Sequence, residues 1–185
     1  MKNAIILHGI SSKPTDFWFP YVGEQLRSRG YNVWTPNLPQ PDAPDIDVVV
    51  PFLLQNGTFT SETVVIGHSS GASLILALLE KLSSSVDCAL LVAGFVERGG
   101  TRPKEAVKPT VDSYAWDKIR GNAHRIFIIN SVNDPWGCDE TQGRIMFDRL
   151  GGTMITNHDG HMGSQYYSQP YREFPLLLSL VDTVA

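Results

Sequence analysis

Cysteine is scarce in this sequence, and long apolar runs are missing. Cys88 and Cys138 are the only cysteines among 185 residues, so several disulfides cannot stabilise the fold as they do in small secreted proteins. No stretch approaches the about 20 apolar residues of a membrane-spanning helix. The first residues, MKNAIILHG, hold too few apolar side chains for a secretory signal. We therefore expect a cytoplasmic protein that does not enter a membrane, with Cys88 as a buried free thiol.

Positive charge is not in excess either. The chain has 15 Lys and Arg against 19 Asp and Glu, a net charge of −4, which gives no reason to expect nucleic acid or an anionic membrane surface as a partner. Hydrophobic residues make up 42% and charged residues 18%, as in an ordinary folded protein. The length suits one domain with a substantial core and is too short for two. Residues 1–185 are therefore expected to form a single domain.

Short apolar runs alternate with helical patterns along the chain. The runs are mostly continuously apolar, as expected of strands covered on both faces of a parallel sheet. Strands are predicted at 4–8, 31–36, 63–68, 88–95, 125–130 and 153–157. Helices are predicted at 17–29, 45–56, 70–83, 137–150 and 171–183, with a weaker pattern at 114–121. This order predicts an α/β fold, a three-layer αβα sandwich around a mostly parallel six-stranded sheet. The longest non-periodic segment, 96–112, is either a small lid or a surface connection.

One short motif indicates a reactive serine. Gly67-His68-Ser69-Ser70-Gly71 fits G-x-S-x-G, follows an apolar β-branched run and opens an apolar helix. In a tight strand-to-helix turn of this kind the central side chain stands clear of the backbone, and the glycines leave room for close approach. Ser69 is therefore the predicted nucleophile, and the backbone N–H of Ser70 is a candidate oxyanion donor. The bare motif is weak evidence, and the alternative is a strand that simply turns into a helix.

The ends of later strands offer an acid and a base. In an open parallel sheet, ligands bind beyond the carboxyl ends of the strands. Asp134 follows one predicted strand; it could equally cap the next helix, and Asp139 is the competing acid. His161 lies in a glycine-flanked loop after the last strand and is favoured as the base over His158, which is nearer the strand end. The chain order Ser, Asp, His is that of α/β-hydrolases.

The end of the first strand should lie beside the serine turn. Its residues His8, Gly9 and Ile10 offer backbone N–H groups, of which that of Ile10 is the predicted second oxyanion donor, with Ser11 as the alternative. His8 could equally be a structural residue that hydrogen-bonds its own loop. Two tryptophans are candidate substrate-binding residues, although each could instead be a packed aromatic of the core: Trp18 and Trp136.

Together these residues resemble the α/β-hydrolase superfamily, and more closely the retinoblastoma-binding protein 9 family of compact serine hydrolases, which includes bacterial YdeN-like members. The resemblance covers nearly the whole chain and rests on ILHGISSKPTDFWFPYVGEQLRSRGYNVWTPNLPQPDAP, GHSSGA, LLVAGF, NDP and GHM. It implies the strand order 2-1-3-4-5-6 and a triad of Ser69, Asp134 and His161. Many members carry further hydrophobic residues after the acid, whereas here Trp136, Gly137 and Cys138 follow it.

The resulting hypothesis is a carboxylesterase-like serine hydrolase. It would cleave an ester or related acyl bond of a small molecule through an acyl-enzyme, without metal or organic cofactor. One alternative is a binding module that keeps the hydrolase scaffold without activity. The other is a metal-dependent hydrolase with His158, Asp159 and His161 as ligands, although no Cys or Glu cluster completes that set.

Overall fold

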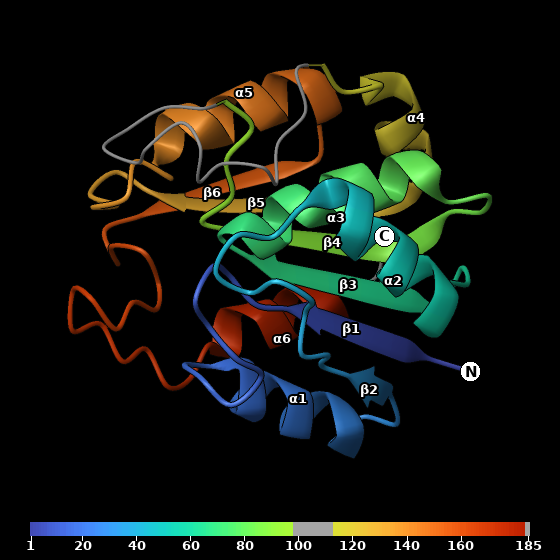
Figure 1. Ribbon diagram of the computed structural model, residues 1–185, viewed down its shortest axis with the longest axis horizontal. Coiled ribbons are helices and arrows are strands. Elements are labelled where there is room, and N and C mark those ends of the chain that lie inside the picture. The colour runs from blue at the N-terminus through green and yellow to red at the C-terminus, as the bar shows by residue number, and fades with distance from the viewer. Residues whose placement is uncertain (98–112, 184–185) are drawn as a thin grey trace.

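A six-stranded sheet in the order β2-β1-β3-β4-β5-β6 runs through the computed structural model, which describes residues 1–97 and 113–183 (Figure 1). Every pair of neighbouring strands is parallel. The strand order implied by the family resemblance is confirmed. The strands are β1 Asn3–Leu7, β2 Asn32–Trp34, β3 Thr63–His68, β4 Val86–Val92, β5 Ala123–Ser131 and β6 Thr153–Asn157.

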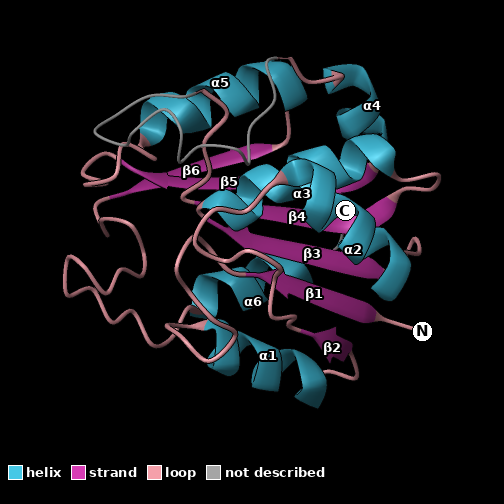
Figure 2. Ribbon diagram, viewed as in Figure 1, coloured by secondary structure: helices cyan, strands magenta, loops and turns pink. Residues whose placement is uncertain are grey.

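Helices cover both faces of this sheet, which makes the three predicted layers (Figure 2). Four helices lie in a row on one face: α2 Ile46–Asn56, α3 Ser70–Lys81, α4 Trp116–Gly121 and α5 Glu140–Leu150. The opposite face carries α1 Phe19–Ser28 and α6 Pro175–Asp182, which contact each other. Each described helix begins and ends within four residues of a predicted one, so the alternation of apolar runs and helical patterns was a reliable guide to the α/β class.

Two cores result, one on each side of the sheet. Successive strand side chains point to opposite faces, so in β1 Ile5 and Leu7 pack toward α2–α5 whereas Ala4 and Ile6 pack toward α1 and α6. All four side chains are buried. This double burial explains why the central strands are continuously apolar rather than alternating, and it holds their carboxyl ends rigidly where the site is built.

Cys88 is a buried free thiol, as expected, and burial raises its pKa to about 12. In the two described stretches no helix is long and apolar enough to cross a membrane. The segment 96–112, expected to be a lid or a surface connection, lies outside the described residues except for Val96 and Glu97.

Candidate active site

The turn between β3 and α3 consists of a single residue, Ser69. β3 ends at His68 and α3 begins at Ser70, while Ser69 has φ 55° and ψ −123°. A non-glycine residue in such a conformation costs about 1–3 kcal/mol and persists only where the surrounding structure imposes it. Here the backbone is held on both sides: the Ser69 N–H donates to Val92 O at 2.8 Å, and its carbonyl accepts from the Ala72 N–H at 3.0 Å. The strained strand-to-helix turn is therefore present.

The glycines around Ser69 are required by close backbone contacts. A Cβ at Gly71 would lie 2.8 Å from the carbonyl oxygen of His8 and closer still to that of Leu7. At Gly67 a Cβ would lie 2.5 Å from the carbonyl oxygen of Gly71. No relaxed carbon approaches backbone atoms so closely. The start of α3 therefore packs directly against the end of β1, which brings the loop after β1 beside Ser69.

Gly71→Ala is expected to lower the free energy of unfolding by about 1–3 kcal/mol, because the added methyl overpacks rigid backbone. Chemical denaturation measures this loss. The matched control is Gly121→Ala at the end of α4, where nothing lies within 4 Å of an added Cβ. That variant should be as stable as the parent or slightly more stable. Equal losses in the two variants would contradict the packing argument.

Asp134 and His161 form a buried hydrogen-bonded pair. The His161 Nδ1–H donates to Asp134 Oδ2 at 2.7 Å, and the two side chains are 5% and 0% exposed. The other carboxylate oxygen, Oδ1, accepts from the backbone N–H of Trp136 at 2.8 Å. The carboxylate is thus fixed by a tight turn of its own chain. It sets the tautomer of the imidazole so that Nε2 is left to act as an acceptor.

The competing acid and base lie elsewhere. Asp139 caps α5, where its carboxylate accepts from the Thr141 N–H at 3.0 Å. His158 is exposed, and its carbonyl oxygen accepts a hydrogen bond from the Asn133 side chain. The structure therefore brings Asp134, not Asp139, to His161, and it leaves His158 outside the pair.

The ligand set of the metal hypothesis is not assembled. Asp159 accepts a hydrogen bond from the Tyr171 hydroxyl at 2.9 Å. Within residues 1–97 and 113–183, only Asp134, Cys138 and His161 form a group whose potential ligand atoms all lie within 4.8 Å of one another. In that group the carboxylate and the imidazole already bind each other at 2.7 Å. The geometry thus favours a hydrogen-bonded acid–base pair over the proposed His158–Asp159–His161 site.

The backbone of His161 is held from both sides. Its N–H donates to Gln169 Oε1 and its carbonyl accepts from His68 Nε2, each at 2.8 Å. Gln169 also exchanges two backbone hydrogen bonds with Ser164, at 2.8 and 2.9 Å. Gly160 has φ +62°, and a Cβ there would collide with the Gln169 amide. Gln169 and His68 therefore fix the position of the imidazole. Sequence reasoning missed Gln169, because nothing local connects it with His161.

His8 has the structural role that the sequence left open. Its Nδ1–H donates to the carbonyl of Gly9 at 2.9 Å, and its Nε2 accepts from the Leu38 N–H at 3.2 Å. Burial lowers the pKa of this imidazole, so it stays neutral, as the acceptor role of Nε2 requires. His8 thereby holds the loop after β1, which carries Ile10.

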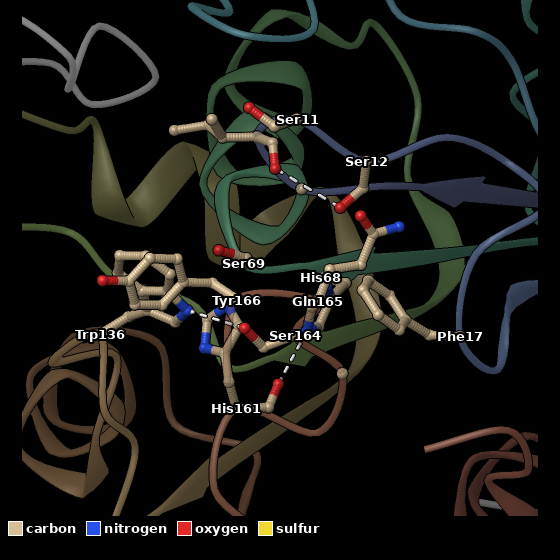
Figure 3. A pocket seen from close by; sticks show the side chains of 13 residues that line it. Ser11, Ser12, Phe17, His68, Ser69, Trp136, His161, Ser164, Gln165 and Tyr166 are labelled. Atoms are coloured by element: carbon tan, nitrogen blue, oxygen red, sulfur yellow. Dashed lines mark hydrogen bonds between the residues drawn. The ribbon is translucent and has the colours of Figure 1, made fainter. Parts of the chain in front are cut away.

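A pocket of about 560 Å³ opens beside Ser69 and His161 (Figure 3). Trp136 lines this pocket, but Trp18 does not, and the role predicted for Trp18 is wrong. Trp18 is fully buried, and its indole N–H donates to Met162 O at 3.0 Å. The neighbouring Phe17, which has a φ of 48°, lines the pocket instead. The lining residues are Gly9, Ile10, Ser11, Ser12, Phe17, His68, Ser69, Trp136, His161, Gly163, Ser164, Gln165 and Tyr166.

Comparison with known proteins gives consistent results over the length of the chain. A family model described as serine hydrolase matches residues 4–180. The rat protein serine hydrolase RBBP9 is 27% identical over 167 residues, which are 89% of this chain and 88% of that protein. The putative hydrolase YdeN of Bacillus subtilis is 30% identical over 99 residues, 52% of each chain.

Solved structures show the same fold. The crystal structure of the ydeN gene product from B. subtilis superposes with a TM-score of 0.89 at 23% identity, over 98% of this chain and 97% of that one. Est1E from Butyrivibrio proteoclasticus, in a structure with bound ferulic acid, gives a TM-score of 0.68 at 12% identity, over 98% of this chain and 86% of that one. At these identities the likeness concerns the fold alone.

Proposed function

Because the chain belongs to the serine hydrolase family, with RBBP9 and YdeN among its relatives as the resemblance predicted, we propose that it cleaves an ester or related acyl bond of a small molecule. The observation that carries the proposal is one arrangement. Ser69, in a strained turn, lines the same pocket as His161, and His161 Nδ1 is hydrogen-bonded to the buried Asp134. These are the three parts that activate a serine hydroxyl.

In the proposed reaction His161 Nε2 takes the proton of Ser69 as its oxygen attacks the substrate carbonyl. Asp134 holds the tautomer and stabilises the imidazolium that forms. The imidazolium then returns its proton to the leaving alcohol, which leaves an acyl group on Ser69. Water, deprotonated by His161, attacks this acyl-enzyme; the bond to Ser69 breaks, the imidazolium returns its proton to the Ser69 oxygen, and the acid is released. Every proton is handled by the one imidazole, so the cycle requires no metal or organic cofactor.

Negative charge on the carbonyl oxygen would be held by two backbone N–H groups. The first is that of Ser70, at the positive N-terminal end of α3. The second is that of Ile10, a residue lining the pocket. The alternative, the Ser11 N–H, already donates to Pro41 O at 2.9 Å, whereas no hydrogen bond between described residues uses the N–H of Ile10. This difference favours Ile10 as the second donor.

The proposal is tested by hydrolysis of p-nitrophenyl esters with acyl chains from acetate upward, with an amino-acid p-nitroanilide alongside. Saturable release of nitrophenol that is lost on treatment with a fluorophosphonate is the expected result. Release from the anilide at a comparable rate would move the assignment from esterase to amidase. No turnover of any ester, together with no fluorophosphonate labelling, would contradict the proposal.

Asp134→Asn is expected to lower kcat by on the order of 10⁴-fold, because the amide offers an N–H to Nδ1 and favours the wrong tautomer of His161. Steady-state hydrolysis of p-nitrophenyl acetate measures the loss. The matched control is Asp139→Asn, since Asn caps a helix as well as Asp does and the Asp139 carboxylate accepts from the Thr141 N–H at the start of α5. If Asp139→Asn were the slower variant, the orienting acid would have been misassigned.

A further inference from the structure

The described lining of the pocket beside Ser69 carries no formal charge. Among the residues of 1–97 and 113–183 that line it, none is Asp, Glu, Lys or Arg. A charged substituent that bound there would lose its hydration. No opposite charge among the described residues of the pocket would compensate for this loss, so its binding would be unfavourable. The groups that enter this pocket should therefore be uncharged.

One side of the pocket is built from aromatic rings. Trp136 lies 5.4 Å from the ring centroid of Tyr166 and 5.0 Å from that of Tyr167, and the two tyrosine rings are 4.9 Å apart. Figure 3 shows Trp136 and Tyr166 together on one side of Ser69, with Phe17 on the opposite side. We call Trp136, Tyr166 and Tyr167 the aromatic wall; Trp136 and Tyr166 line the pocket, and Tyr167 packs against both rings. The Trp136 ring lies 6.5 Å from that of His161 between ring centroids.

The aromatic wall is held in place and yet exposed. The Trp136 indole N–H donates to Ser164 Oγ at 3.2 Å, and the backbone of Ser164 is paired with Gln169. Tyr166 is 78% exposed and Tyr167 40%, and they are the only aromatic residues among the exposed large hydrophobic side chains in the described part of the chain. Aromatic rings that line a pocket, with an exposed ring among them, are suited to contact another ring.

From these observations we propose that the preferred substrates are uncharged esters that carry an aromatic ring, and that this ring packs against the aromatic wall. The inference rests on the proposed function, because the ring is bound for hydrolysis by Ser69. The reaction is unchanged: water splits the ester into its acid and its alcohol. The ring can belong to either half of the ester, and matched substrates distinguish the two.

The test uses pairs of esters that differ only in a phenyl or a cyclohexyl ring. Methyl 3-phenylpropanoate and methyl 3-cyclohexylpropanoate place the ring in the acyl half, and benzyl acetate and cyclohexylmethyl acetate place it in the alcohol half. Cyclohexyl is the more apolar ring, so a wall that acted only through hydrophobic burial would favour the cyclohexyl ester. We expect one pair to show kcat/KM higher for the phenyl ester by roughly 2- to 10-fold, the effect of one ring contact. A carboxylate in the para position of that phenyl ring should abolish the advantage.

Variants of Tyr166 test whether the preference for phenyl over cyclohexyl esters comes from the aromatic wall. Tyr166→Leu, at an exposed position where folding should be unaffected, is expected to bring the phenyl-to-cyclohexyl ratio close to one, whereas Tyr166→Phe should keep it. The same substitution at Tyr31, which precedes β2 at the opposite end of the sheet, should leave the ratio unchanged.

Two failures can be told apart with ethyl propanoate, which has no ring. Turnover of ethyl propanoate with no phenyl preference in either pair, or with a preference that Tyr166→Leu does not alter, would overturn this inference alone. No turnover of any ester would overturn the proposed function and this inference with it.

Discussion

Ser69→Ala is expected to lower kcat by on the order of 10⁶-fold, as loss of the nucleophile does in other triads. The Ser69 hydroxyl is the proposed nucleophile, so the remaining turnover would come from the oxyanion donors and the pocket acting on water. The fold should be retained, because Ala replaces a small side chain in the same turn. Hydrolysis of p-nitrophenyl acetate and a thermal unfolding curve measure the two effects.

Ser70→Ala is the matched control for this variant. The Ser70 side chain is buried, and its hydroxyl has no hydrogen-bond partner among the described residues, so its removal leaves no polar group unpaired. Its proposed contribution is a backbone N–H, which Ala keeps. Ser70→Ala should therefore retain most of the activity and its labelling by a fluorophosphonate. An inactive Ser70→Ala and an active Ser69→Ala would show that the nucleophile was misassigned. A parent protein that no fluorophosphonate labels would favour the binding-module alternative.

The fold was largely predictable because its signals are local. Continuous apolar runs identify strands buried on both faces, and only their ends were misplaced. The run 88–95 ends as a strand at Val92, and the residue that follows, Ala93, takes a positive φ of 47°. The last two helices begin later than predicted, at residues that the sequence does mark: Asp139 caps α5, and Pro175 is the first residue of α6.

The site was predictable where its residues follow strand ends, and not where distant segments meet. Ser69, Asp134 and His161 could be placed from the order of the strands, because the carboxyl ends of parallel strands share one edge. The pocket wall depends on tertiary packing. Trp18 and Phe17 are aromatic neighbours, and the sequence does not show that Phe17 lines the pocket while Trp18 is buried and donates to Met162 O. Gln169 reaches His161 only through the paired loop that it closes with Ser164.

His161→Ala is expected to lower kcat as severely as Ser69→Ala, again by on the order of 10⁶-fold, because members of a triad act as a unit. Without the imidazole, the Ser69 proton has no acceptor and the leaving alcohol receives none. The variant also leaves the buried Asp134 carboxylate without its partner at 2.7 Å, so some loss of stability is expected as well. Steady-state kinetics at a temperature well below the unfolding midpoint keeps the two effects apart.

The matched control is His158→Ala, since that imidazole is exposed and lies only three residues away in the same loop. It should retain nearly all of the activity, because between described residues the hydrogen bond at His158 uses its carbonyl, which accepts from Asn133, and alanine keeps that carbonyl. Dialysis of the parent protein against EDTA tests the remaining explanation, a metal-dependent reaction. Activity that survives dialysis, together with a large difference between the two histidine variants, is what a proton relay through His161 requires. Equal losses in the two variants, with activity that returns only when Zn²⁺ is added, would instead mean that both imidazoles bind a metal.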